Sequence, residues 1–182
     1  IIYCNRHWTF DQGSFVLLNN GTVNFSLNDN SRITCNSEDS YFHDLKINKP
    51  VDKTVSFNEA STHDLWIKGD LTIQAGTFYC NSPRTVLLEG AFTTGGNFQF
   101  DDGNIKFLGS SAFLYSPTGS YFNHIYLKTT QPVYMSSDLH LNGDLTIDFN
   151  SGVLHSQNFD IYIGGNWKNH KGRDGFVEGS GT

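Results

Sequence analysis

The chain has 182 residues, of which 37% are hydrophobic, 14% aromatic and 16% charged, and its formal net charge is −6. This length can bury one sizeable core, and the aromatic content excludes a disordered chain. The acidic balance, without any basic cluster, argues against a nucleic-acid partner. No apolar stretch reaches the length of a membrane span.

Short strands with a period of two are predicted along the whole chain, because apolar residues alternate with polar ones. In chain order the inward pairs are Leu45 and Ile47, Val55 and Phe57, Leu65 and Ile67, Leu71 and Ile73, Val86 and Leu88, Phe98 and Phe100, Ile125 and Leu127, Val133 and Met135, Leu139 and Leu141, Leu145 and Ile147, and Ile161 and Ile163. Turns rich in Gly, Asn and Asp separate these strands, for example at 68–70, 101–103 and 142–144.

An internal repeat is the strongest feature of the sequence. His63–Ile73 reads HDLWIKGDLTI and Ser137–Ile147 reads SDLHLNGDLTI; Tyr41–Ile47 (YFHDLKI) returns as Tyr121–Leu127 (YFNHIYL). The matches keep their order, so the chain divides into a partial repeat (1–40), a full repeat of about 80 residues (41–120) and a second partial repeat (121–182). We therefore expect a piece cut from a longer protein that continues with an apolar-x-aromatic strand after Thr182.

Short strands, frequent turns and an uncapped repeat favour a solenoid, and we predict an all-β, right-handed parallel β-helix forming a single repetitive unit over 1–182. At about 20 residues per coil, one repeat would make about four coils, and the Gly69-Asp70 joint would turn a corner. Aromatic residues at equivalent repeat positions would then stack in the core: Trp8 with Phe92 and Trp167, Phe15 with Phe98 and Phe176, and Phe42 with Phe122. A tandem pair of β-sandwiches is the alternative.

The string L-x-I-x-G-D-L-T-I, preceded by F-x-x-L-x-I and followed by V-x-L-x-G-x-F and G-x-I-x-F-x-G-S, resembles the repeats of very large secreted surface proteins of Bacteroidetes-type bacteria. The resemblance covers nearly the whole chain. It implies an adhesin-like β-helical rod, type 9 secretion, and an extracellular or cell-surface location. The implied partners are adjacent repeats or domains of the same protein, and glycans or surface proteins.

Catalytic and metal-binding patterns are weak. Asp101 and Asp102 could suggest a glycosidase pair, but Asp-Asp-Gly-Asn is a good turn and adjacent strand residues point to opposite faces. The seven histidines form neither HxH nor HExxH. We predict no catalytic residues, no metal site and no cofactor, with Ca²⁺ at 28–30 or 101–102 as the less favoured alternative to solvated turns. Cys4, Cys35 and Cys80 are predicted to be buried small residues, and the possibility of one disulfide among them stays open.

Four aromatic residues lie between inward apolar neighbours and should point outward: Trp66, Tyr126, Tyr134 and Tyr162. They are the candidate binding residues for sugar rings or partner proteins, and ordinary surface aromatics are the competing interpretation. The main functional hypothesis is a non-catalytic structural or adhesive segment, a stalk or passenger of a secreted bacterial surface protein. The alternative is a glycan-binding or polysaccharide-degrading β-helix.

Overall fold

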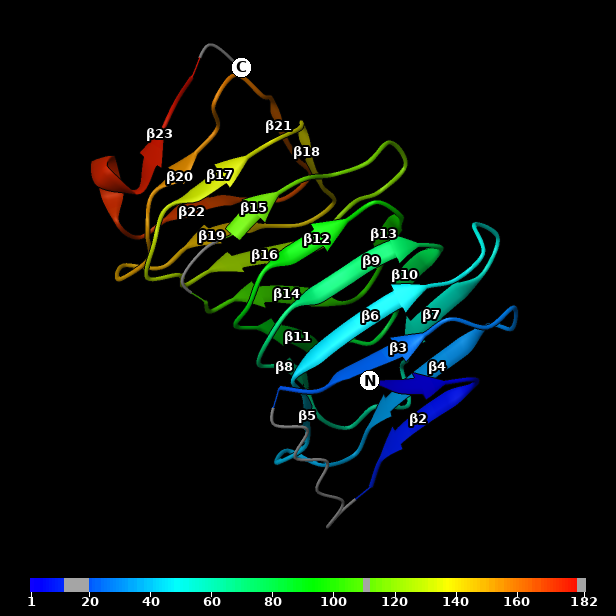
Figure 1. Cartoon of the computed structure of the whole chain (residues 1–182). Coiled ribbons are helices and arrows are strands. Elements are labelled where there is room, and N and C mark those ends of the chain that lie inside the picture. Colours follow the sequence, from blue (N-terminus) through cyan, green and yellow to red (C-terminus); the bar gives the residue numbers. More distant parts are fainter. Residues whose placement is uncertain (12–19, 110–111, 180–182) are drawn as a thin grey trace.

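A computed structural model describes residues 1–11, 20–109 and 112–179 of the chain. It is a right-handed parallel β-solenoid that climbs coil by coil from the N-terminal to the C-terminal end (Figure 1). The described helical content is one short 3-10 helix, η1 (Gly172–Gly175). The predicted β-helix is therefore confirmed. The sandwich alternative is wrong, because neighbouring strands such as β3 and β6 pair in parallel.

Three faces form the walls of the solenoid. The first face starts with a five-stranded sheet and continues in a four-stranded one. Its strands, in stacking order, are β1 (Ile2–Cys4), β3 (Thr22–Phe25), β6 (Asp44–Asn48), β9 (Leu71–Ala75) and β12 (Phe92–Thr94), then β15 (Ala112–Leu114), β17 (Val133–Met135), β20 (Leu154–His155) and β23 (Phe176–Val177).

The second face likewise consists of two sheets, joined by the isolated bridges Gln99–Tyr121 and Phe122–Leu141. Its strands are β2 (His7–Phe10), β4 (Ser31–Cys35), β7 (Thr54–Phe57), β10 (Thr77–Cys80) and β13 (Asn97–Phe100), then β18 (Leu139–Leu141) and β21 (Ile161–Ile163).

The third face is one continuous sheet of seven strands. They are β5 (Tyr41–Phe42), β8 (Leu65–Ile67), β11 (Thr85–Leu88), β14 (Asn104–Phe107), β16 (His124–Leu127), β19 (Leu145–Ile147) and β22 (Trp167–Asn169). The length of one coil varies: registered partners are 19 residues apart from Val86 to Ile105 and 26 apart from Leu45 to Leu71.

A single core runs along the solenoid axis. Every second residue of a strand points inward, as in β7, where Val55 and Phe57 are fully buried while Thr54 and Ser56 are half-buried. The alternation predicted from the sequence is thus the alternation observed. Burying such apolar side chains contributes about 1.5–3 kcal/mol each, which offsets the entropy cost of ordering the coils.

Corner aspartates connect successive coils. Asp70 Oδ1 accepts the backbone N–H of Ala91 at 2.8 Å, and Asp144 Oδ1 accepts that of Asn166 at 2.8 Å. Asp64 and Asp138 do the same for Thr85 and Asp160. The carboxylate before a strand therefore satisfies a donor one coil further on, a side-chain cap for a turn. This is the physical reason for the recurring Asp-Leu at these four corners.

The sequence repeat and the coils have different periods, which refines the expectation of about four coils per repeat. Leu65 opens β8 on the third face, but its repeat partner Leu139 opens β18 on the second face. In the same way Phe25, on the first face, is equivalent to Phe107 on the third. From one copy of the repeat to the next, the chain passes through three full coils and two more faces. Each copy of the repeat therefore begins one face earlier in the coil than the copy before it.

The predicted stacking of repeat-equivalent aromatic residues is consequently wrong. Trp8, Phe92 and Trp167 lie on the second, first and third faces in turn, so they cannot stack on one another. Their inward direction is confirmed for Phe92, which is 4% exposed. The buried rings instead contact unrelated repeat positions, as Phe98 and Phe122 do at 4.4 Å between centroids. Phe15 lies outside the described residues.

Candidate functional site

The four predicted aromatic residues lie on all three faces. Trp66 (β8) and Tyr126 (β16) share the third face but are three coils apart, while Tyr134 (β17) is on the first face and Tyr162 (β21) on the second. Each lies between two inward residues and points outward as predicted. The structure does not bring the four together into one site.

On the third face, charged side chains already contact the outward aromatic residues. The Lys68 ammonium lies 3.7 Å from the ring centroid of Tyr41 and 4.9 Å from that of Trp66, whose Nε1–H donates to Glu89 at 2.8 Å. Lys106 lies 4.5 Å above the ring of Tyr126. These cation–π contacts stabilise the face and cover the ring surfaces that a ligand would need.

A different row of planar side chains runs along the outside of the second face. From coil to coil, Tyr79, Gln99, Tyr121, His140 and Tyr162 are register neighbours or adjacent to the bridged positions. The rings of His140 and Tyr162 are stacked, with centroids 4.6 Å apart and planes 4° from parallel. We call these five residues the planar row.

Asp101 fixes the N-terminal part of the planar row. The hydroxyls of Tyr79 and Tyr121 donate to the two oxygens of its carboxylate, one each. The hydrogen bond to Asp101, assisted by burial, raises the pKa of Tyr121 to about 12. Asp101 and Asp102 lie in the bend between β13 and β14, as the turn interpretation predicted, and the Asp101 carboxylate is already engaged.

A groove of about 890 Å³ lies beside the row, between Tyr121 and His140. Its lining comprises Tyr115, Ser116, Pro117, Thr118, Gly119, Ser120, Tyr121, Ser137, Asp138, His140 and Asn142. Residues 115–120 form its wall, and hydrogen bonds hold this wall in place. The N–H of Ser116 donates to Ser137 Oγ at 2.7 Å, and the N–H of Ser120 donates to the Pro117 carbonyl at 2.9 Å. Gly119, at φ +83°, supplies the left-handed residue of that turn.

The proposed Ca²⁺ alternative at 28–30 meets a positive charge. The Lys49 ammonium donates to the Asp29 carbonyl oxygen and to Ser31 Oγ, both at 2.8 Å. Lys49 is only 1% exposed, and this burial lowers the pKa of its ammonium group. Asn30 Oδ1 is also engaged, by the N–H of Thr54. Over the described residues, no group of three or more His, Cys, Asp or Glu could hold a metal ion.

Cys4, Cys35 and Cys80 are all free and buried, so the open question of a disulfide is settled against one. Burial raises the pKa of the Cys35 thiol to about 11 and that of the Cys80 thiol to about 12. Thiols with such pKa values are protonated near neutral pH and are weak nucleophiles. Their positions support the prediction of small core residues rather than of a redox site.

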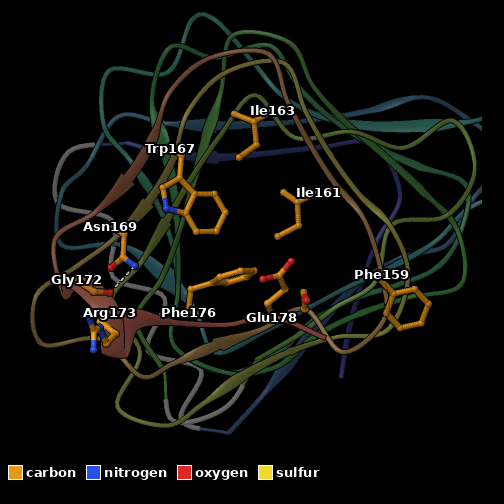
Figure 2. A pocket seen from close by; sticks show the side chains of 10 residues that line it. Phe159, Ile161, Ile163, Trp167, Asn169, Gly172, Arg173, Phe176 and Glu178 are labelled. Carbon is orange, nitrogen blue, oxygen red and sulfur yellow. Dashed lines mark hydrogen bonds between the residues drawn. The ribbon is translucent and has the colours of Figure 1, made fainter. Parts of the chain in front are cut away.

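A second, apolar opening of about 460 Å³ lies at the C-terminal end of the core (Figure 2). Figure 2 shows Ile161, Ile163, Trp167 and Phe176 around the open centre of the coil. Trp167 is 40% exposed, whereas Leu145, its register partner one coil earlier, is fully buried. Over residues 112–179, no further coil lies across this end of the core.

Sequence reasoning missed Tyr79, Tyr121 and His140 as members of one row. Their spacing along the chain differs from coil to coil, so no fixed period marks them as neighbours. A scan against protein-family models and searches of curated proteins and of solved structures found no match to this chain. Within the described ranges, none of the helical structure is long and apolar enough to cross a membrane.

Proposed function

We propose that this chain is a non-catalytic structural and adhesive segment, a stalk or passenger of a secreted bacterial surface protein of the Bacteroidetes type. The observation that carries the proposal is the continuous apolar core, around which three faces of parallel strands stack coil on coil. Stacked repeats of this kind gain their stability from their neighbours, which suits a rod-like scaffold.

The use of the carboxylates supports a structural function. The four corner aspartates Asp64, Asp70, Asp138 and Asp144 each accept a backbone N–H from the next coil. Asp101 holds two tyrosines. These five carboxylates are thus engaged in holding neighbouring coils together, which favours a rod over a polysaccharide-degrading enzyme.

Antibodies raised against the folded chain test the location. On intact cells of the organism that encodes it, the proposal expects surface labelling that protease treatment of the cells removes. Labelling only after permeabilisation would contradict a surface protein. A cytoplasmic enzyme probed in parallel serves as the control for cell integrity.

The open end can be tested on the purified chain. We expect ANS to bind there and the chain to self-associate with rising concentration, since an uncovered apolar core end is a sticky surface. Ile163→Lys should reduce both signals, while Thr146→Lys, on the outside of β19, should leave them unchanged. Equal ANS binding by both variants would speak against the opening as the site of ANS binding and self-association.

A further inference from the structure

We propose that the groove beside the planar row binds a linear, neutral polysaccharide, with sugar rings lying on Tyr115, Tyr121 and His140. The inference names the ligand class for the adhesive part of the proposed function and rests on that function for its biological use. The binding itself is argued from the chemistry of the groove alone.

The aromatic residues of the groove are the first argument for sugar binding. Tyr115 is 41% exposed, and His140 is exposed while its ring is held by Tyr162 at 4.6 Å. Tyr121 is fixed through Asp101. Rings whose orientation is already fixed lose little entropy on binding, and their flat apolar surfaces match the C–H face of a sugar ring.

The polar groups of the groove suit hydroxyls. Asp138 uses Oδ1 for the N–H of Asp160 at 3.0 Å, which leaves Oδ2 as an acceptor for a ligand hydroxyl. The Asn142 side chain, which can both donate and accept, is exposed and has no hydrogen bond within the described part of the chain. A few directed polar groups around an apolar platform are what a small-molecule site requires for orientation.

Charge restricts the ligand to a neutral one. Among the described residues, the groove lining contains Asp138 and neither Lys nor Arg, and the chain as a whole carries a formal net charge of −6. An anionic polysaccharide or a nucleic acid would meet repulsion without any compensating cation. The competing aromatic face, with Trp66 and Tyr126, is covered by Lys68 and Lys106 instead.

The geometry of the solenoid favours a chain rather than a single sugar. Successive side chains of the planar row are separated by the rise of one coil, about 4.8 Å, which is the spacing of neighbouring strands. A linear polysaccharide running parallel to the solenoid axis has a comparable ring-to-ring spacing. Because His140 and Tyr162 cover one face of each other's ring, successive sugar rings would contact Tyr115, Tyr121 and the side of His140 that faces away from Tyr162.

Isothermal titration of the full chain with hexasaccharides tests the proposal. The probes are neutral β-1,4-glucan, β-1,4-mannan, β-1,4-xylan and α-1,4-glucan, beside anionic polygalacturonate and a basic hexapeptide. We expect at least one neutral probe to bind and neither charged probe to do so. Binding of a charged probe alone, or of none, would overturn the proposal whatever the surface labelling shows.

Variants place the binding on the molecule. Tyr115→Ala and His140→Ala each remove an exposed ring and should weaken the affinity for the neutral probe at least tenfold. Trp66→Ala, on the third face, is the matched control and should leave the affinity within twofold. Circular dichroism confirms that each variant is folded. Loss of binding in Trp66→Ala but not in His140→Ala would move the site to the third face and refute the groove.

Discussion

The same ten-residue sequence motif occurs at two places in this solenoid, with different surroundings and nearly the same backbone contacts. In the first copy, Asp64–Ile73, the chain turns from the third face to the first; in the second copy, Asp138–Ile147, it turns from the second face to the third. The hydrogen bond from Gly90 N–H to Gly69 O and that from Gly165 N–H to Gly143 O are both 3.0 Å. The motif therefore encodes a strand–corner–strand unit, independent of the face on which it lies.

The largest expected effect comes from the core of the two copies. Leu71→Ala and Leu145→Ala each remove a fully buried side chain and should lower the free energy of unfolding by about 2–5 kcal/mol. The loss for Leu71→Ala should lie at the upper end of this range, because several coils cover Leu71 on both sides. Urea denaturation measures both values. A far larger loss for Leu145 would contradict the equivalence of the copies.

The corner glycines should give the next largest effect. A Cβ on Gly69 would lie 2.8 Å from the His43 carbonyl oxygen, and one on Gly143 would lie 2.8 Å from the Asn123 carbonyl oxygen. Both backbones must shift, so Gly69→Ala and Gly143→Ala should each cost about 1–3 kcal/mol in thermal unfolding experiments. If either variant matched the parent, the close approach of coils at that corner would be refuted.

The corner aspartates sharpen the comparison further. Asp70→Ala removes the acceptor of the Ala91 N–H and should cost about 1 kcal/mol, whereas Asp70→Asn retains an acceptor oxygen and should cost less. Asp144 has an additional partner in Lys168, and this bond lowers the pKa of Asp144 from 3.8 to about 2. The first copy has Thr93, on β12, in place of that lysine.

Lowering the pH should therefore destabilise the second copy through protonation of Asp144. A carboxyl whose folded-state pKa is depressed contributes stability that is present above its ordinary pKa and lost as the pH falls through the folded value. The contribution of Asp144 should thus disappear between pH 3.8 and about 2. Asp144→Asn should flatten this part of a stability-against-pH curve measured by urea denaturation. An unchanged curve would mean that Lys168 does not hold the carboxylate.

The smallest expected effect on stability concerns the group that accepts a hydrogen bond from the N–H of the corner aspartate. In the first copy the Asp70 N–H donates to Asp44 Oδ1 at 3.0 Å; in the second the Asp144 N–H donates to His124 Nδ1 at 2.8 Å. His124→Asp would supply a carboxylate oxygen, as Asp44 does in the first copy, and should change stability by less than about 0.5 kcal/mol at neutral pH. NMR exchange of the Asp144 amide proton reports this bond directly.

The sequence was sufficient to predict the fold class, the strands and the Gly-Asp corners, because alternation and turn residues are local signals. The shift of each repeat copy to a different face could not be predicted from the sequence, since coil length varies, from 19 to 26 residues in the pairs compared above. For the same reason Tyr121 and His140 could not be recognised as neighbours. Lys49 shows another limit: a lysine after a strand usually faces water, and only the structure reveals the Asp29 carbonyl that accepts a hydrogen bond from its ammonium group.

The mismatch between repeat and coil gives the surface a screw symmetry. Each copy of the motif is displaced by three and two-thirds coils, which corresponds to a rise of about 18 Å at 4.8 Å per coil, and by one third of a revolution. In a longer array of this kind, identical surface residues would trace a spiral, and every third copy would return to the same side. A partner that recognises one copy could then be engaged from any direction around the rod.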